Sequence, residues 1–542
     1  MARGRSWALA HSLFVGVVSA IESSGECALA TTTVYLPTTI YAFAPNVTSS
    51  HVGDSCVLTS SSSTIVGTST SSSTGTTEVT STPTSTLPVP TSSSEIVTTI
   101  SSTTITSVSV TPTSWSNSTI TSGSSVSTST GLPTPTSIGG LPPPPPPPSG
   151  PFKGYRNAVY FTNWGIAQEN YIPQDLPVDD ISHVLYAFAD IAPNGTVLSA
   201  NPVADLSQKY SDDAHWEPGR NAYGAVKQLY VHKKYNRHLK VLLSVGGGDF
   251  SPKFAAATST DMRRQTFAKS AVKLVTDWGL DGVDIDWEYP TNEVERDSLV
   301  KLVAACREAF DRYSFHNHLH YRFLVTVASP AGAANWKFVD LPRMDRYVDI
   351  WHLMSYDYSG VWNPRSGHQA NVFANKANEA STPLNTDDAV RYYETQGISR
   401  RKIVVGLPLY GRSFDGTSGL GQNYTSVGTG GPQPGVWYYK DLPKKGALED
   451  FDDVAKATYS YDRKTRELIS YDDVRSTAFK ARYIANRGLG GAFFWEASGD
   501  RTGRGSLVKT MSRDLDWMDR TPNNLHYPTS QYRNIRLGVP GA

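Results

Sequence analysis

The sequence predicts an α/β protein in which residues 151–520 form a (β/α)8 TIM barrel, and two observations carry this prediction. After Gly154, short runs rich in β-branched residues alternate with segments of helical periodicity, which is typical of a parallel sheet joined by helical crossovers. Eight such runs are present, enough to close a barrel. A doubly wound open sheet is the alternative, but no glycine-rich phosphate-binding fingerprint follows the first run.

The strands are expected where short apolar runs are bounded by turn residues. They fall at residues 158–162, 183–189, 240–245, 282–288, 323–328, 350–356, 403–409 and 492–495. Helices are expected at residues 221–235, 259–278, 294–312, 386–396 and 475–487. The third helix carries Leu299, Leu302, Val303 and Cys306 at helical spacing, so this face should pack against the barrel.

Residues 413–470, between the seventh and eighth strands, are more than a barrel loop needs. They contain two strand-like runs, Val436-Trp437-Tyr438-Tyr439 and Ala457-Thr458-Tyr459-Ser460-Tyr461. We therefore expect a small α+β insertion domain between strands 7 and 8.

The chain before the barrel divides into three parts. Residues 1–20 read as a signal peptide, because Arg3 and Arg5 precede an apolar run that ends in Ser19-Ala20. An uncleaved anchor and cleavage after Ala30 are the alternatives. Residues 21–58 form a short segment of unknown role, either a miniature module or a disordered lead-in.

Residues 59–150 form a disordered linker rich in Ser, Thr and Pro, too polar to bury a core, which we expect to be extended and O-glycosylated. Its run of prolines from Pro142 to Pro148 should act as a stiff spacer. After the barrel, residues 521–542 are expected to form a C-terminal tail.

Composition excludes several classes of partner. The 542 residues carry no formal net charge and 18% are charged, so nothing favours binding to nucleic acid or to an anionic membrane. No metal site is expected from the spacing of the three cysteines, and no cofactor. If the chain is exported, Cys27 and Cys56 could pair, whereas Cys306 should be a buried free thiol. We expect a secreted monomer, and sequons at Asn46, Asn117, Asn194 and Asn423 are consistent with export.

The stretch Asp281-Gly282-Val283-Asp284-Ile285-Asp286-Trp287-Glu288-Tyr289-Pro290 points to chemistry. Alternate side chains of a strand share one face, so Asp284, Asp286 and Glu288 form an acidic row. Close carboxylates raise the pKa of one member, which lets it remain protonated and act as a general acid. Glu288 is nearest the carboxyl end of the strand, where parallel α/β folds place their ligands. A solvated acidic edge strand or a calcium site is the alternative.

The same stretch resembles the DGxDxDWEYP signature of chitinases in glycoside hydrolase family 18. The resemblance implies hydrolysis of β-1,4 linkages in chitin or chitooligosaccharides by a retaining mechanism in which the substrate's N-acetyl group is the nucleophile. It further implies that Glu288 is the acid and base, that Asp286 orients the acetamide and that Tyr356 bonds its carbonyl oxygen. Asp284 would share a proton with Asp286, and Asp281 would be structural.

Further motifs extend the resemblance over residues 155–518. Ser244-Val245-Gly246-Gly247 is similar to the family's SxGG motif, and Met354-Ser355-Tyr356-Asp357 to its MxYD motif. The resemblance implies substrate-binding roles for Trp495, Trp362, Tyr160, Met354, Asp357, Arg412 and Ser244. For Tyr160 and Arg412, packing or a structural ion pair is an equal alternative.

One departure from the pattern is Gly248-Asp249-Phe250, where some relatives carry Trp after the glycines. The platform for the leaving-group sugars is therefore either missing or supplied by Phe250. Since family members with such an insertion have one wall of the cleft raised, the resemblance implies a deep, tunnel-like cleft with processive or exo-leaning action. Two other functions stay open: a non-catalytic chitin-binding lectin, and an endo-N-acetylglucosaminidase acting on N-glycans.

Overall fold

The computed structural model describes residues 153–213 and 217–539, together with the backbone of four strands near the N-terminus. The chain divides into two units, residues 1–130 and 131–542. In the first, β1 (Val15–Ser23) pairs antiparallel with β2 (Glu26–Val34), and β3 (Asn46–Val52) with β4 (Ser55–Ser61). Residues 1–14 of the expected signal peptide, the side chains of Cys27 and Cys56, and the linker beyond residue 61 lie outside the described residues.

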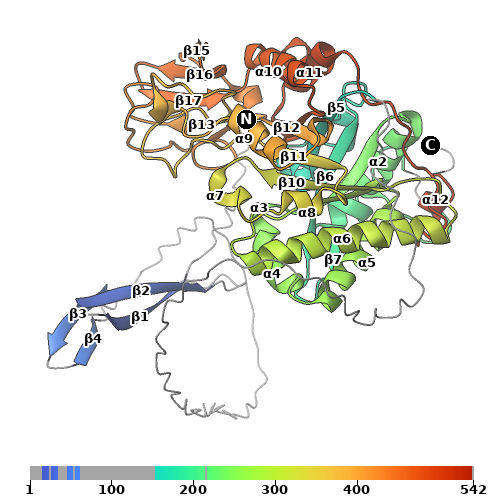
Figure 1. Cartoon of the computed structure of the whole chain (residues 1–542), viewed down its shortest axis with the longest axis horizontal. Helices are drawn as coiled ribbons and strands as arrows, with labels where there is room; N and C mark the ends of the chain where they lie inside the picture. The colour runs from blue at the N-terminus through green and yellow to red at the C-terminus, as the bar shows by residue number, and fades with distance from the viewer. Residues whose placement is uncertain are drawn as a thin grey trace, which may run out of the picture. The chain divides into compact units, whose positions relative to one another are not determined.

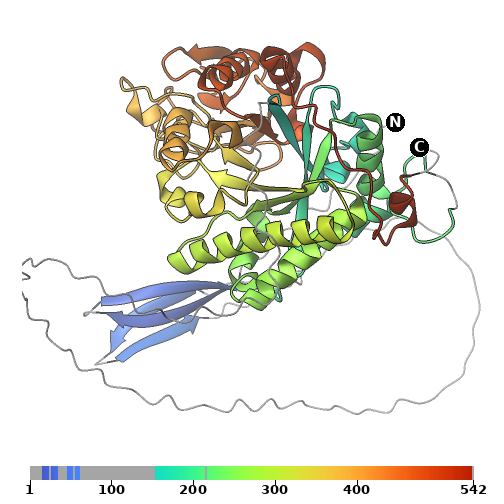
Figure 2. The ribbon, with the colours of Figure 1, turned by 45° about the vertical axis from the view of Figure 1, so that its right-hand side comes forward.

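Eight parallel strands of the second unit close into a barrel, as the sequence predicts (Figures 1 and 2). They are β5 (Arg156–Thr162), β6 (His183–Ile191), β8 (Lys240–Gly246), β9 (Gly282–Asp286), β10 (Leu324–Pro330), β11 (Ile350–Met354), β12 (Ile403–Pro408) and β18 (Gly491–Trp495). Pairing of β5 with both β18 and β6 closes the ring, and the short β7 (Val197–Ser199) adds antiparallel to β6.

Helices cover the outside of the barrel (Figure 2). The longer ones are α2 (Gly224–Tyr235), α5 (Asp261–Trp278), α6 (Glu293–His316), α9 (Thr386–Thr395), α10 (Val474–Arg487) and α11 (Leu507–Leu515). Short helices are α1 (Gly165–Gln168), α3 (Gly247–Phe250), α4 (Phe254–Ala257), α7 (Ala333–Trp336), α8 (Leu341–Met344) and α12 (Arg533–Arg536). Helix α6 begins after Asn292, whose side-chain oxygen accepts from the N–H groups of Val294 and Glu295. Its apolar face is buried as predicted, including Cys306, a free thiol.

Two strands end two residues before the predicted ends. The ladder between β8 and β9 stops at Gly246 and Asp286, and the one between β10 and β11 stops at Pro330 and Met354. Proline has no N–H to continue the second ladder. Beyond β9, the N–H of Glu288 donates instead to the hydroxyl of Ser251, at 2.7 Å. The chain therefore leaves the sheet just before Glu288 and Tyr356, which lie at the carboxyl rim of the barrel.

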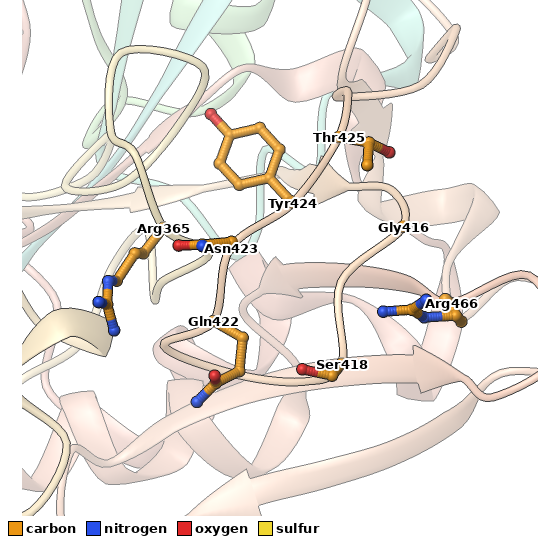
Figure 3. A pocket seen from close by; sticks show the side chains of 8 residues that line it. All are labelled: Arg365, Gly416, Ser418, Gln422, Asn423, Tyr424, Thr425 and Arg466. Carbon is orange, nitrogen blue, oxygen red and sulfur yellow. The ribbon is translucent and has the colours of Figure 1, made fainter.

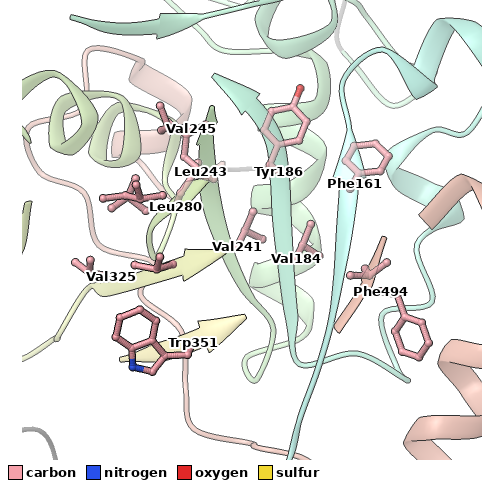
Figure 4. Packing of buried hydrophobic residues seen from close by; sticks show 14 of the residues in the cluster. Phe161, Val184, Tyr186, Val241, Leu243, Val245, Leu280, Val325, Trp351 and Phe494 are labelled. Atoms are coloured by element: carbon pink, nitrogen blue, oxygen red, sulfur yellow. The ribbon is translucent and has the colours of Figure 1, made fainter. Parts of the chain in front are cut away.

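Side chains pack in two layers on either side of the barrel wall. Outward-facing residues such as Val184, Val241 and Trp351 meet the helices in the larger apolar cluster (Figure 4). A smaller cluster fills the interior of the barrel; it consists of Ala158, Tyr160, Leu185, Ala187, Phe188, Leu242, Ala328, Ile350, Met354, Val404 and Phe493. This alternation places the acidic row inside the barrel, with apolar neighbours below the rim.

The insertion between the seventh and eighth barrel strands forms its own antiparallel sheet. The strands are β13 (Tyr410–Phe414), β14 (Val436–Tyr438), β15 (Leu448–Asp452), β16 (Ala457–Asp462) and β17 (Glu467–Tyr471), in the order β14-β13-β17-β16-β15. Both predicted strands are present. The helical part is only a single 3-10 turn, Tyr439–Asp441, so the insertion is almost entirely β.

The C-terminal segment packs against the amino-terminal end of the barrel strands. Tyr527 and Ile535 are fully buried, and the N–H of Asn524 donates to Asp281, at 3.0 Å. The buried Lys233 binds both the Asp281 carboxylate, at 2.8 Å, and the hydroxyl of Tyr527. Asp281 thus ties β9, α2 and the C-terminal segment together, the structural role expected for it.

Candidate active site

Asp284 lies at the centre of a set of hydrogen-bond donors inside the barrel. It is fully buried, and each of its two oxygens accepts from two side chains. The donors are the hydroxyls of Tyr160 (2.9 Å), Ser244 (2.8 Å) and Thr326 (2.6 Å), and Nδ1 of His352 (3.1 Å). Burial alone would raise the pKa of Asp284, but the hydrogen bonds, first that of His352, outweigh it and lower the pKa. Asp284 is therefore a carboxylate.

Asp286 is the opposite case. It is 3% exposed, and its Oδ1 has no hydrogen-bond partner among the described residues. Burial, followed by the negative charges of Glu288 and Asp284, raises its pKa well above the usual value. No hydrogen bond joins Asp284 and Asp286 in the described part of the chain, because other donors already occupy both oxygens of Asp284. Of the two, Asp286 therefore has the higher affinity for a proton.

Glu288 has the proton affinity of a general acid. Burial raises its pKa to about 7, and the charge of Asp357 adds to this effect. A carboxyl group with a pKa near the working pH can both donate and recover a proton. The sequence predicted that a neighbouring acid of the row would raise the pKa of Glu288. The charge that raises it is instead that of Asp357, in the loop after β11.

Asp357 is held in a fixed position by the insertion. Its two oxygens accept from Nε and Nη2 of Arg412, each at 2.6 Å, and the hydroxyl of Tyr410 donates to it. Of the alternatives open for Arg412, the structure shows the ion pair. Tyr356 lies beside this group, with its ring 6.3 Å from that of Tyr410, and its pKa is raised well above 10 first by burial. Its hydroxyl is therefore a neutral donor at the rim.

Aromatic side chains surround the acidic row. The ring of Trp495 stacks on Phe188 at 5.7 Å and contacts Tyr160 at 5.1 Å and Trp164 at 6.3 Å. Trp362 is 53% exposed, and the guanidinium of Arg412 lies 4.6 Å from its ring centre. Trp495 ends β18 and Trp362 follows β11, both at the carboxyl rim, and their role as sugar platforms stays a prediction.

Three of the predicted substrate-binding residues lie behind the row. Tyr160, Ser244 and Met354 are 1%, 0% and 8% exposed. The first two donate to Asp284, and Met354 packs in the interior cluster. Tyr160 and Ser244 therefore position Asp284, and the substrate-binding roles expected for the three residues stay predictions.

The two glycines of the SxGG segment are required by close packing. A Cβ on Gly246 would lie 2.2 Å from the carbonyl oxygen of Asp286, and one on Gly247 would lie 2.3 Å from the ring of Phe188. Both have positive φ, 112° and 74°. Beyond them Phe250 is half-buried against the interior cluster.

Sequence reasoning missed three residues of the site. Trp164 and Phe188 complete the aromatic surround, and His352 supplies a donor to Asp284. Period-two spacing could have found His352, because residues 352, 354 and 356 alternate on the predicted strand. Trp164 follows the first strand by two residues, where barrel folds place ligands.

Three hollows in the described part of the chain are lined by residues outside the acidic row. A polar pocket of about 320 Å³ is lined by Arg365 and by residues of the insertion, among them Asn423, Tyr424 and Arg466 (Figure 3). The Tyr424 hydroxyl donates to the carbonyl of Asn363, next to Trp362. No helix within the described residues is both long and apolar enough to cross a bilayer.

A buried carboxyl group whose pKa is raised to about 7, beside a second buried acid at the carboxyl rim of a (β/α)8 barrel, fits the acid of a glycosidase. Residues 156–500 match the glycosyl hydrolases family 18. The chain belongs to this family and is an enzyme of the glycoside hydrolase class.

Curated relatives and solved structures agree. The chain is 49% identical over 383 residues to Endochitinase 1 of Metarhizium robertsii, covering 71% of this chain and 90% of the relative. It is 46% identical over 386 residues to Chitinase 1 of Aphanocladium album, covering 71% and 91%. Among solved structures, the catalytic domain of psychrophilic chitinase B from Arthrobacter TAD20 superimposes with a TM-score of 0.63 at 27% identity, covering 69% of this chain and 98% of that one.

Proposed function

We propose that this enzyme hydrolyses the β-1,4 linkages between N-acetylglucosamine units of chitin and chitooligosaccharides. The observation that carries the proposal is the division of protons along the acidic row. Hydrogen bonds lower the pKa of Asp284, burial and the neighbouring acids raise the pKa of Asp286 well above its usual value, and the pKa of Glu288 is about 7. The similarity to relatives that are named chitinases supports this substrate.

The proposed reaction is the substrate-assisted one that the family resemblance implies, and the pKa directions of the acids support it. Glu288 donates its proton to the glycosidic oxygen, and the carbonyl oxygen of the substrate's N-acetyl group attacks the anomeric carbon as the C–O bond breaks. This forms an oxazolinium ion with the leaving sugar now a free alcohol. Glu288, now a carboxylate, takes a proton from water, which attacks the anomeric carbon and opens the ring. The configuration at the anomeric carbon is retained, because it is inverted twice.

Asp286 and Tyr356 would hold the acetamide during this reaction. Oδ1 of Asp286 is buried and has no partner among the described residues, so it can accept from the acetamide N–H. The neutral hydroxyl of Tyr356 would donate to the carbonyl oxygen that attacks. Trp495 would lie under the sugar at the cleavage point, where its indole face matches the apolar face of a pyranose.

The proposal includes secretion of the protein and O-glycosylation of the linker that precedes the barrel. Export rests on the basic residues and apolar run of residues 1–20. N-terminal sequencing of protein recovered from the culture medium would identify the cleavage point; a mature chain that still begins at Met1 would contradict the signal peptide.

The deciding experiment is a time course of products from the N-acetylglucosamine hexamer, with the anomer of the new reducing end read by proton NMR before mutarotation. Initial release of the β anomer supports retention and the substrate's own nucleophile. An α anomer contradicts the mechanism. Steady release of dimers indicates exo or processive action, and a mixture of lengths indicates endo action.

Two outcomes would replace the proposal. Binding of the hexamer without cleavage would make the protein a chitin-binding lectin. Release of N-glycans from a denatured glycoprotein, with the hexamer left intact, would make it an endo-N-acetylglucosaminidase.

A further inference from the structure

His352 is a buried titratable side chain that the proposed reaction does not use. It lies on β11, two strands from the acidic row, and is 1% exposed. Its Nδ1 lies 3.1 Å from Oδ1 of Asp284, and its ring packs edge-on against Phe493 with the centroids 5.2 Å apart. Its Nε2 is also buried but has no hydrogen-bond partner among the described residues.

These contacts define which nitrogen carries the proton. The other three groups around Asp284 are hydroxyls that donate to it, so the carboxylate acts only as an acceptor. Nδ1 of His352 must therefore donate. A second proton on Nε2 would have no acceptor and would cost the desolvation of a buried charged donor. The geometry favours the Nδ1–H tautomer, with Nε2 buried and without a hydrogen-bond partner among the described residues.

We propose that His352 is a positioning residue for the proposed hydrolysis: its Nδ1–H holds Asp284 as a carboxylate, and the charge of Asp284 in turn keeps the proton on Asp286. The inference rests on the proposed function for its catalytic consequence only. Among the groups that lower the pKa of Asp284, His352 has the largest effect, and Asp284 contributes to the raised pKa of Asp286.

The interior of the barrel contains few other groups that could take over this role. The titratable side chains that interact with His352 or with Asp284 are Tyr160 on β5, His183 on β6 and Asp286 on β9. Tyr160 already donates to Asp284, and Asp286 carries the proton in question. Nδ1 of His183 is engaged with the hydroxyl of Ser182, at 2.8 Å. Loss of the His352 donor would leave Asp284 with three donors of the original four.

Two amide substitutions distinguish the effect of losing the hydrogen-bond donor from the effect of losing the imidazole ring. In His352→Asn, the amide nitrogen lies about where Nδ1 lies, so the hydrogen bond to Asp284 can be kept. In His352→Gln, it lies about where Nε2 lies, which moves the donor away from Asp284. Both variants are polar, uncharged and smaller than or similar in size to histidine, so each controls for the other.

The first readout is the pH profile of hexamer hydrolysis. We expect His352→Asn to retain kcat within about threefold of the wild type, whereas kcat of His352→Gln falls roughly 10- to 100-fold, the factor for one hydrogen bond to a charged group. With Asp284 easier to protonate, the acidic limb of the His352→Gln profile should move up by about one pH unit. KM should change little, because neither the side chain at position 352 nor the Asp284 carboxylate would touch the substrate.

The second readout is independent of turnover. Since the pKa of Asp284 is lowered by folding, its contribution to stability is present above its unfolded pKa and is lost as the pH falls through the folded pKa. The Tm of the wild type and of His352→Asn should therefore fall more steeply as the pH decreases below about 4 than that of His352→Gln.

The outcomes are distinct. Equal acid dependence of Tm in the two variants, whatever their activity, would overturn the role of His352. A wild type that does not cleave the hexamer would instead overturn the proposed function, and the comparison of Tm would still decide on His352.

Discussion

The charge of Asp357 is one of two reasons why Glu288 holds a proton near neutral pH, which makes Asp357→Asn a test of the site's electrostatics. Burial is the larger cause, and together the two raise the pKa of Glu288 from 4.5 to about 7. This shift corresponds to about 3 kcal/mol in favour of the protonated acid. The variant keeps the burial, loses the negative charge and leaves the Arg412 guanidinium without its carboxylate. Both changes favour ionised Glu288, so its pKa should fall by about one unit.

The sign of the effect on activity follows from the role of Glu288. A general acid must be protonated, so the basic limb of kcat/KM follows its pKa. A fall from about 7 to about 6 lowers the protonated fraction at about pH 8 roughly tenfold and leaves it almost unchanged at about pH 5. The assay is kcat/KM for a fluorogenic chitobioside between about pH 4 and pH 9, where the position of the limb, and not its height, is compared.

The matched control is Asp249→Asn, which removes an exposed acid just beyond the carboxyl end of β8. Its profile should coincide with that of the wild type. A basic limb of Asp357→Asn at the wild-type position, or at a higher pH, would refute the account of how Glu288 is tuned.

Three further predictions concern other parts of the barrel. Glu288→Gln should lower turnover of the hexamer at least about 100-fold while calorimetry still detects its binding, because only the proton donor is lost; near-normal turnover would exclude this acid. Trp362→Ala should weaken binding of the hexamer roughly tenfold, measured in the Glu288→Gln background, with an unchanged Tm, since its ring is 53% exposed. Lys233→Met should lower the free energy of unfolding in urea by about 3–5 kcal/mol, because it leaves the buried Asp281 without its cation. Lys273→Met, whose lysine is 65% exposed in its pair with Asp277, should cost less than about 1 kcal/mol.

The barrel was predictable because its signals are local. A strand or a helix can be recognised by the period of its apolar residues, and this period depends only on nearby positions in the chain. All eight strands lie where the apolar runs placed them, and α6 buries the predicted face. The ends of β9 and β11 were less predictable, because they depend on where the neighbouring ladder stops, at Asp286 and at Pro330.

The acidic row was also visible in the sequence, since Asp284, Asp286 and Glu288 follow the two-residue period of a single strand. The pKa of each acid could not be predicted from the sequence. Asp284 is a carboxylate because donors separated from it by 124, 40, 42 and 68 residues converge on it. The pKa of Glu288 depends on Asp357, which an arginine of the insertion holds in place.

The sequence by itself therefore determined the class of fold, the position of the acids and the family to which the enzyme belongs. Only the tertiary structure decided where the protons lie, that Tyr160 and Ser244 support Asp284 from behind, and that His352 takes part. The physical reason is the separation along the chain of the residues that interact. Secondary structure is specified by neighbours in the chain, whereas a pKa is set by burial and by charges that the fold brings together from distant segments.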